Sequence, residues 1–457
     1  MSSLPPPSLS AGSGETSALV LTPHLVTEVP GPESRSLAAR LAAAECPAFD
    51  ARRRAREEAS GEAFAPIVYR EGRGANVWDV DGNRFVDFVA GFGALSFGHR
   101  PDRVERAALA EQERLGLALG DVYASDVKVE LLESLRALHW DSGARVMLGL
   151  SGADATTAAL KTAALATGKA GVIAFDGSYH GLSHGPLAAC GLKESFRAPF
   201  AGQTGGFVHF APFPASAAQL PRALDVVRGL LARGDVGAIM VEPILGRGGV
   251  VVPPDDFLPA LRAFAHERGA LLVADEIWTG LGRSGDALAS DRSGARPDLV
   301  CVGKALGGGY PISACIGSAE AMAAWGAHGG ATLHTATHFG APPACAAALA
   351  VLERMRHPGF LEDVSRRGLV LRAAILEHAS GLVREVRGRG LMIGVELTDG
   401  AQALAVMQRL LRRGYIVLTG GVRGETLTLT PPLDVPEACF EPFALALADA
   451  VREEGAP

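Results

Sequence analysis

Short apolar runs alternate with stretches of helical periodicity through the middle of the chain, from about residue 145 to 313. Helical patterns such as residues 153–168 and 257–269 separate several of these runs. Runs that are apolar throughout are typical of strands buried on both sides of a parallel sheet. The runs are RVMLGL, GVIAFDG, GFVHFAP, VGAIMVEP, LLVADEI and LVCVGKA. The pattern predicts an α/β fold with a mostly parallel sheet.

The two ends of the chain have different patterns. Near the N-terminus, two helical segments precede an alternating segment, NVWDVDGNRFVDFV, which predicts a hairpin turning at Asp81-Gly82. After about Val351, helices and strands alternate in a way that indicates a small α+β layer. We therefore predict four parts: a disordered tail (1–34), helices and a hairpin that pack on the small domain (35–95), a large domain (96–350) and a small C-terminal domain (351–457).

Composition narrows the class of protein. The chain has 457 residues, is 48% hydrophobic and carries a net charge of -7, which argues against a nucleic-acid partner. It contains no stretch of about 18 uninterrupted apolar residues, so we expect no membrane span. Its first residues lack the features of a signal peptide, and its six cysteines are far apart without CxxC spacing. These features favour a cytoplasmic enzyme with reduced thiols and no metal site.

Polar residues follow five of the apolar runs at the point where each run ends: Ser151, Asp176, Glu242, Asp275 and Lys304. The carboxyl ends of parallel strands meet at one edge of a sheet, and ligands bind there. Any one of these residues could be a cap or a turn. Together they predict a ligand-binding site at this edge of the sheet.

Two of the surrounding segments suit a flat, phosphorylated ligand. Gly152 and Ala153 begin a helix after Ser151, and the free N–H groups at a helix start bind phosphate. Tyr179 lies between small residues, where its ring could stack on a planar group. Taken alone, the first segment is better explained as a helix with an ordinary serine cap, and the second as a tyrosine in a loop.

The other two residues suggest the chemistry. A carboxylate such as Asp275, placed directly after a buried strand, requires a partner: an arginine, a protonated ring nitrogen or, least favoured here, a metal. Lys304 is one of only five lysines, and a poorly solvated lysine can form a Schiff base with a carbonyl, although a surface lysine is the simpler alternative. A phosphate cradle, a stacking ring, a carboxylate and a Schiff-base lysine together predict a pyridoxal 5'-phosphate site.

Nine motifs occur in the order found in one known family: VWDVDGNRFVDF, SGADA, YHG, VEPI, DEIWTGLGRSG, GKALGGGYPISA, THFGAP, VRGRGLMIG and TPPL. On these motifs the chain resembles the class III, fold-type I, pyridoxal-phosphate-dependent aminotransferases, which include ω-transaminases, 4-aminobutyrate aminotransferase and glutamate-1-semialdehyde aminomutase. The resemblance runs from about Glu33 to the C-terminus. It implies a large domain with a mostly parallel sheet and a small α+β domain.

The resemblance also implies roles for individual residues. Lys304 would form the Schiff base and move a proton, Asp275 would keep the ring nitrogen protonated, and Tyr179 and Ile277 would hold the two ring faces. Gly152 and Ala153 would bind the phosphate through their N–H groups.

Thr337, with Thr335 as the alternative, would reach the phosphate in the neighbouring subunit. That role implies a homodimer with active sites at the interface.

The sequence departs from the family at charged positions that hold substrate carboxylates. Leu182 replaces an arginine, Arg247 replaces a glutamate in VEPILGRGG, and Thr428 replaces the switchable arginine before PPL. We expect Arg247 either to bind a substrate carboxylate or to pair with Glu242 or another acid, and we weigh the two equally.

The resemblance implies a ping-pong transaminase acting on an amine or ω-amino acid and a 2-oxo acid. A related aminomutase, epimerase, decarboxylase or lyase is the first alternative, and a non-enzymatic protein on the same fold is the second.

Overall fold

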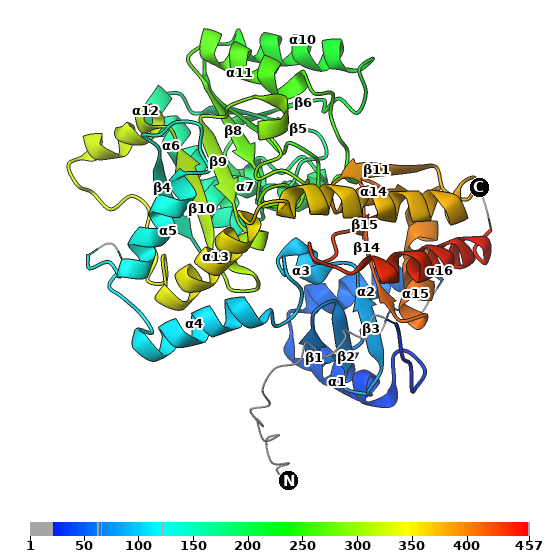
Figure 1. The fold of residues 1–457 in the computed structure, drawn as a ribbon. Coiled ribbons are helices and arrows are strands. Elements are labelled where there is room, and N and C mark those ends of the chain that lie inside the picture. Colours follow the sequence, from blue (N-terminus) through cyan, green and yellow to red (C-terminus); the bar gives the residue numbers. More distant parts are fainter. Residues whose placement is uncertain (1–21, 62–63, 65, 121, 456–457) are drawn as a thin grey trace.

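The structure, a computed structural model, describes residues 22–61, 64, 66–120 and 122–455. Its largest sheet has seven strands in the order β4-β10-β9-β8-β7-β5-β6 (Figure 1). Six of these strands coincide with the six apolar runs, so the predicted α/β fold is confirmed. The strands are β4 (Arg145–Gly149), β5 (Gly171–Phe175), β6 (Val208–Ala211), β7 (Val236–Val241), β8 (Leu271–Asp275), β9 (Leu299–Val302) and β10 (Ser313–Gly317).

Strand β10 is the one strand of this sheet that the apolar runs of the sequence did not predict. It follows the glycine-rich segment after Lys304 and runs antiparallel to both of its neighbours, β9 and β4. The pairs β5–β6, β5–β7, β7–β8 and β8–β9 are parallel. Because β10 reverses direction, β4 points the same way as the parallel strands. Their carboxyl ends therefore share one edge of the sheet.

Helices cover both faces of this sheet, as the uniformly apolar strands require. On one face Val172 and Ala174 of β5 pack in a cluster with the alanines of α6 (Gly152–Thr167). On the other face Ile173 and Phe175 pack with α10 (Leu220–Leu231) and α11 (Phe257–Glu267). The alternation of side chains along one strand thus builds two apolar layers.

The predicted hairpin is confirmed. Strands β2 (Asn76–Asp79) and β3 (Arg84–Asp87) pair antiparallel, and Gly82 in the connecting turn has a φ of +89°. Strand β1 (Tyr69–Arg73) pairs with β2, while β13 (Tyr415–Ile416) pairs in parallel with β3. Segments from opposite ends of the chain thus share a sheet, drawn in blue and orange in Figure 1.

The expected tail needs a correction over its last part. Residues 1–21 lie outside the described residues, but residues 22–34 contact the hairpin. The side-chain oxygen of Asn83 accepts the N–H groups of Val26 and Thr27, at 2.8 and 3.0 Å. The carboxylate of Asp81 accepts those of Glu33 and Ser34, at 2.7 and 2.9 Å, where the helix α1 (Pro32–Ala44) begins. Polar side chains of the turn therefore fix a segment whose own composition suggested disorder.

A third sheet, in the order β11-β12-β15-β14, is antiparallel and packs against α14 and α16 in the apolar core of the C-terminal part. The expected domain boundary at residue 350 falls inside α13, so the division into domains stays a prediction. The remaining longer elements are α1 (Pro32–Ala44), α2 (Pro47–Ser60), α4 (Asp102–Arg114), α5 (Asp126–Arg136), α13 (Pro342–Met355), α14 (Phe360–Ala379), β11 (Glu385–Arg389), β12 (Met392–Glu396), α15 (Gly400–Arg412), β14 (Leu418–Gly420), β15 (Thr426–Leu429) and α16 (Phe440–Arg452).

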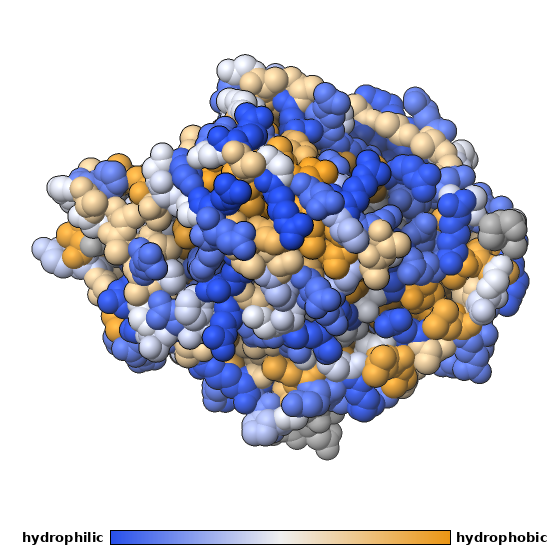
Figure 2. All heavy atoms as spheres, turned by 90° about the horizontal axis from the view of Figure 1, so that it is seen from above, coloured by the Kyte–Doolittle hydropathy of each residue, from blue (hydrophilic) through white to orange (hydrophobic). Residues whose placement is uncertain are grey.

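The surface is mixed in character. Figure 2 shows hydrophilic and hydrophobic side chains interspersed over the face seen from above. Among the described residues, every helix is too short or too polar to cross a bilayer.

Candidate active site

A pocket of about 280 Å³ lies at the carboxyl edge of the seven-stranded sheet. Four of the five polar residues predicted to meet at this edge line it: Ser151, Glu242, Asp275 and Lys304. Asp176 does not line the pocket and its side chain is exposed. The sheet therefore gathers residues from four separate strand ends, as the sequence predicted.

The start of α6 forms one wall of the pocket. Ser151 caps this helix: its hydroxyl accepts the N–H of Asp154 at 3.3 Å, and the Asp154 carboxylate accepts the N–H of Ser151 at 2.9 Å. The ordinary-cap explanation is thus correct for the Ser151 side chain. The cap leaves the first helical N–H groups, those of Gly152 and Ala153, without an acceptor inside the helix. A Cβ on Gly152 would lie 2.9 Å from Cγ2 of Ile277, so glycine keeps this wall open.

Asp275 ends β8 and is only 3% exposed. Its carboxylate is fixed on two sides: His180 Nδ1 donates to one oxygen at 2.7 Å, and the N–H of Ile277 donates to the other at 3.1 Å. Burial opposes a charge on the His180 ring, but the bond to Asp275 and the charges of Asp275 and Glu242 raise the pKa of His180 overall. Asp275 is held as an oriented carboxylate that faces the pocket.

His180 is the functional residue that reading the sequence missed. It lies inside the YHG motif, but nothing in the local pattern separates a structural histidine from one that orients a carboxylate. Only the fold brings the turn after β5 next to the end of β8 and so exposes the pairing.

Glu242 and Lys304 titrate at unusual values because the pocket is poorly solvated. Burial raises the pKa of Glu242 to about 7, with a further contribution from Asp275 and an opposing one from His180. Burial also lowers the pKa of Lys304 to about 8, where Asp275 and Glu242 oppose the shift and Arg247 adds to it. The Lys304 Nζ lies 4.5 Å from the centroid of the Trp278 ring. The pocket therefore favours the neutral form of the Lys304 amine more than an exposed position would, and the neutral form is the one that can act as a nucleophile.

Tyr179 lines the pocket, and Arg247 stacks on its ring from the neighbouring cavity. The N–H of Tyr179 donates to Glu242 at 2.7 Å, and the N–H of Gly246 donates to the other oxygen at 3.0 Å. The guanidinium carbon of Arg247 lies 4.6 Å from the centroid of the Tyr179 ring. Glu242 is thus satisfied by backbone groups, and within the described part of the chain Arg247 pairs with no acid. The alternative that Arg247 pairs with Glu242 is wrong.

The positions that depart from the family pattern lie near this pocket. Leu182 is half-exposed at its lining. Thr428 lines a neighbouring cavity together with Arg247. Thr337 and the alternative Thr335 are both exposed and do not line the pocket of their own chain.

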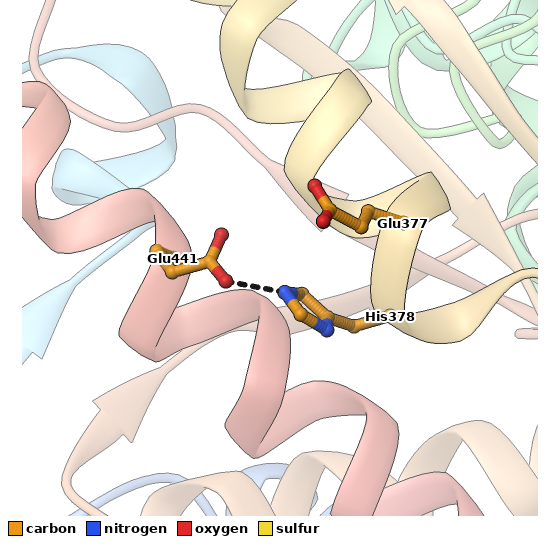
Figure 3. Close-up of side chains that lie close together, drawn as sticks. All are labelled: Glu377, His378 and Glu441. Atoms are coloured by element: carbon orange, nitrogen blue, oxygen red, sulfur yellow. Dashed lines mark hydrogen bonds and ion pairs between the residues drawn. The ribbon is translucent and has the colours of Figure 1, made fainter.

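One group of side chains among the described residues has the composition of a cation site: Glu377, His378 and Glu441. Figure 3 shows that the bond drawn among them joins His378 to Glu441, at 2.5 Å, between α14 and α16. None of the three lines the pocket that holds Lys304. This group is explained as a surface contact between two helices.

Comparison with known proteins agrees with the geometry. The family model described as aminotransferase class-III matches residues 58–451. Acetylornithine aminotransferase of Methanopyrus kandleri is 36% identical over 392 residues, 85% of this chain and 95% of that protein. The 5-aminovalerate aminotransferase DavT of Pseudomonas aeruginosa is 32% identical over 406 residues, 85% and 94% of the two chains.

A solved amine transaminase from an uncultivated Pseudomonas species, in a form with pyridoxal phosphate bound, has a TM-score of 0.77 and 28% identity, covering 85% of this chain and 94% of that one. The pocket fits the same cofactor: the free helix N–H groups suit its phosphate, the buried Asp275 suits its ring nitrogen, and Lys304 suits its aldehyde. The chain therefore belongs to the class-III aminotransferase family, and it is a pyridoxal-phosphate-dependent transaminase.

Proposed function

We propose that the enzyme moves an amino group between an amine or ω-amino acid and a 2-oxo acid in two half-reactions that share one site. The observation that carries this proposal is the buried Asp275–His180 pair in the same pocket as the poorly solvated Lys304. Relatives named for acetylornithine and 5-aminovalerate support an amino acid as the donor. Pyridoxal phosphate, when bound, supplies a ring that withdraws electrons from the amine-bearing carbon of the substrate.

Each residue of the pocket then has a separate role. Lys304 Nζ holds the cofactor and carries a proton to and from the substrate carbon. Asp275, oriented by His180, keeps a proton on the ring nitrogen. Tyr179 and Ile277 confine the ring between them.

Different groups hold the phosphate and the substrate. Gly152 and Ala153 bind the phosphate through backbone N–H groups at the start of α6. Arg247, which pairs with no acid in the described part of the chain, binds a substrate carboxylate.

The assembly we propose is a cytoplasmic homodimer. Thr337 is exposed and lies outside the pocket of its own chain, which supports a role in the site of a neighbouring subunit. All six cysteines are free thiols and five of them are buried, which supports a reducing compartment. Sedimentation of the purified protein tests the dimer, and Thr337→Ala is expected to weaken cofactor retention without changing the sedimentation coefficient.

The visible spectrum of the purified enzyme tests the central proposal. Adding an amine donor without a 2-oxo acid is expected to bleach the absorbance band of the bound cofactor, because the first half-reaction needs no acceptor. Lys304→Ala is expected to abolish the reaction, whereas Lys193→Ala, which changes an exposed lysine, serves as the matched control. A Lys304→Ala variant that turns over like the wild type would refute the assignment.

The same assay separates a transaminase from the alternative reactions of the family. An aminomutase, epimerase, decarboxylase or lyase forms product without any added oxo acid and regenerates the band. Stoichiometric bleaching that is reversed by a 2-oxo acid identifies the transaminase.

A further inference from the structure

A second cavity, of about 230 Å³, lies beside the pocket that holds Lys304. Trp278 lines both cavities, and its ring is in contact distance of the Lys304 amine. Arg247 lines the second cavity and stacks on Tyr179 of the first. A ligand in the second cavity would therefore be the far end of a molecule whose other end reaches Lys304.

The second cavity has an unexpected concentration of arginine. Three arginines of α2, Arg52, Arg53 and Arg56, line it together with Arg247. Residues four apart on a helix face the same way, which explains why Arg52 and Arg56 reach one cavity. The glutamates of α2, Glu57 and Glu58, do not line the cavity.

Most of the positive charge in this cavity is not balanced by the acidic side chains that the structure describes. Arg53 forms an ion pair with Glu45 and lies 3.7 Å from Asp50. Arg52, Arg56 and Arg247 have no acidic partner among the described residues, and no aspartate or glutamate lines the cavity. The three unpaired guanidinium groups affect one another: burial, Arg52 and Arg247 together lower the pKa of Arg56 to about 10. Like charges held together are stabilised when an anion binds between them.

Two uncharged donors add to the guanidinium groups. The Thr428 hydroxyl is buried, with the residue 4% exposed, and it has no hydrogen-bond partner in the part of the chain that the structure describes. The indole N–H of Trp278 is likewise buried and has no hydrogen-bond partner among the described residues. Both residues line the second cavity. Buried polar groups of this kind are normally satisfied, so their shared cavity indicates a ligand with several oxygen atoms.

We propose that Arg52, Arg56 and Arg247 bind the end of the amino donor that is remote from its amine, and that this end carries two negative charges, from two carboxylates or from one phosphoryl group. The inference rests on the proposed function and names its substrate class. Arg52 and Arg56 precede Glu58, the first residue that the family model matches.

Binding of ligands that lack an amine tests the inference without turnover. Titration calorimetry of the holoenzyme with ethylmalonate, propylphosphonate and butyrate, at a pH above the second pKa of the phosphonate so that it carries two charges, compares two carboxylates, one phosphonate and one carboxylate on similar chains. We expect a doubly charged ligand to bind about tenfold to a hundredfold more tightly than butyrate, because one further charge-assisted contact has about that effect. The better of the two doubly charged ligands identifies the source of the charge. Equal binding of all three would overturn the inference.

Variants of α2 test the residues. Arg52→Gln and Arg56→Gln should each reduce the preference for the doubly charged ligand about tenfold or more. Arg54→Gln is the matched control, since Arg54 lies on the same helix, is 65% exposed, pairs with Asp50 and does not line the cavity. An unchanged preference in both cavity variants would overturn the assignment.

Donors on one carbon skeleton connect the binding to the reaction. (2-Aminoethyl)malonate and 3-aminopropylphosphonate should bleach the cofactor band at lower concentrations than 4-aminobutyrate, and butylamine should require the highest. If butylamine bleaches the band as readily as the doubly charged donors, the inference falls and the transaminase assignment stands. If no donor bleaches the band while the calorimetric preference is present, the proposed function falls and the anion site stands.

Discussion

The lowered pKa of Lys304 predicts how fast the cofactor-free enzyme takes up pyridoxal phosphate at each pH. Only the neutral amine attacks the aldehyde, so the uptake rate follows the neutral fraction of Lys304. At pH 7, a lysine with the pKa of about 8 found here is about one-tenth neutral, whereas at the ordinary 10.5 only about 3 molecules in 10,000 are. The lowered pKa thus increases the neutral fraction of Lys304 at pH 7 roughly 300-fold, and we expect uptake to be faster for this reason.

The direction of the effect follows from burial. Burial disfavours the charged form of an amine, so the pKa falls and the neutral form becomes available at lower pH. Stopped-flow absorbance of the cofactor-free enzyme mixed with pyridoxal phosphate measures the rate between pH 6 and 10. We expect the rate to rise up to about pH 8 and then to level off. A rate that keeps rising tenfold per pH unit through pH 10 would refute a buried, poorly solvated Lys304.

Two substitutions should move this midpoint in opposite directions. Glu242→Gln removes a negative charge that favours the protonated amine, so the midpoint should fall, most clearly above pH 7, where Glu242 is ionised. Arg247→Gln removes a positive charge that disfavours it, so the midpoint should rise. Shifts of the same sign would show that the charges do not act on Lys304 as the geometry requires.

Three other predictions concern the walls of the site and the N-terminal segment. Gly152→Val places carbon atoms against Ile277 and should weaken cofactor binding about tenfold or more by equilibrium dialysis, with an unchanged circular dichroism spectrum. His180→Phe keeps a ring but removes the hydrogen bond to the buried Asp275, so cofactor affinity should fall about tenfold to a hundredfold. An unchanged affinity would show that His180 has no part in cofactor binding. Asp81→Ala removes the acceptor for the first N–H groups of α1, so the local stability of α1 should fall by about 1 kcal/mol. Hydrogen exchange of α1 should then accelerate, while exchange in the seven-stranded sheet stays unchanged.

Local sequence determined the helices and strands and singled out the residues that we propose to react. Uniformly apolar runs gave the strands because both faces of a parallel sheet are buried, and Asp81-Gly82 gave the hairpin because the turn needs a residue with positive φ. Lys304 and Asp275 could be singled out because a charged residue directly after a buried strand requires a chemical reason.

Tertiary structure decided the relations between residues far apart in the chain. Strand β10 is an ordinary apolar segment, and only its pairing with β9 and β4 shows that it runs antiparallel. His180 meets Asp275 because the sheet places two strand ends side by side, and the arginines of α2 meet Arg247 because α2 packs against the C-terminal part. The sequence specifies each side chain and its local conformation. The electrostatic environment of a side chain is set by neighbours from other elements, and only the folded chain brings them together.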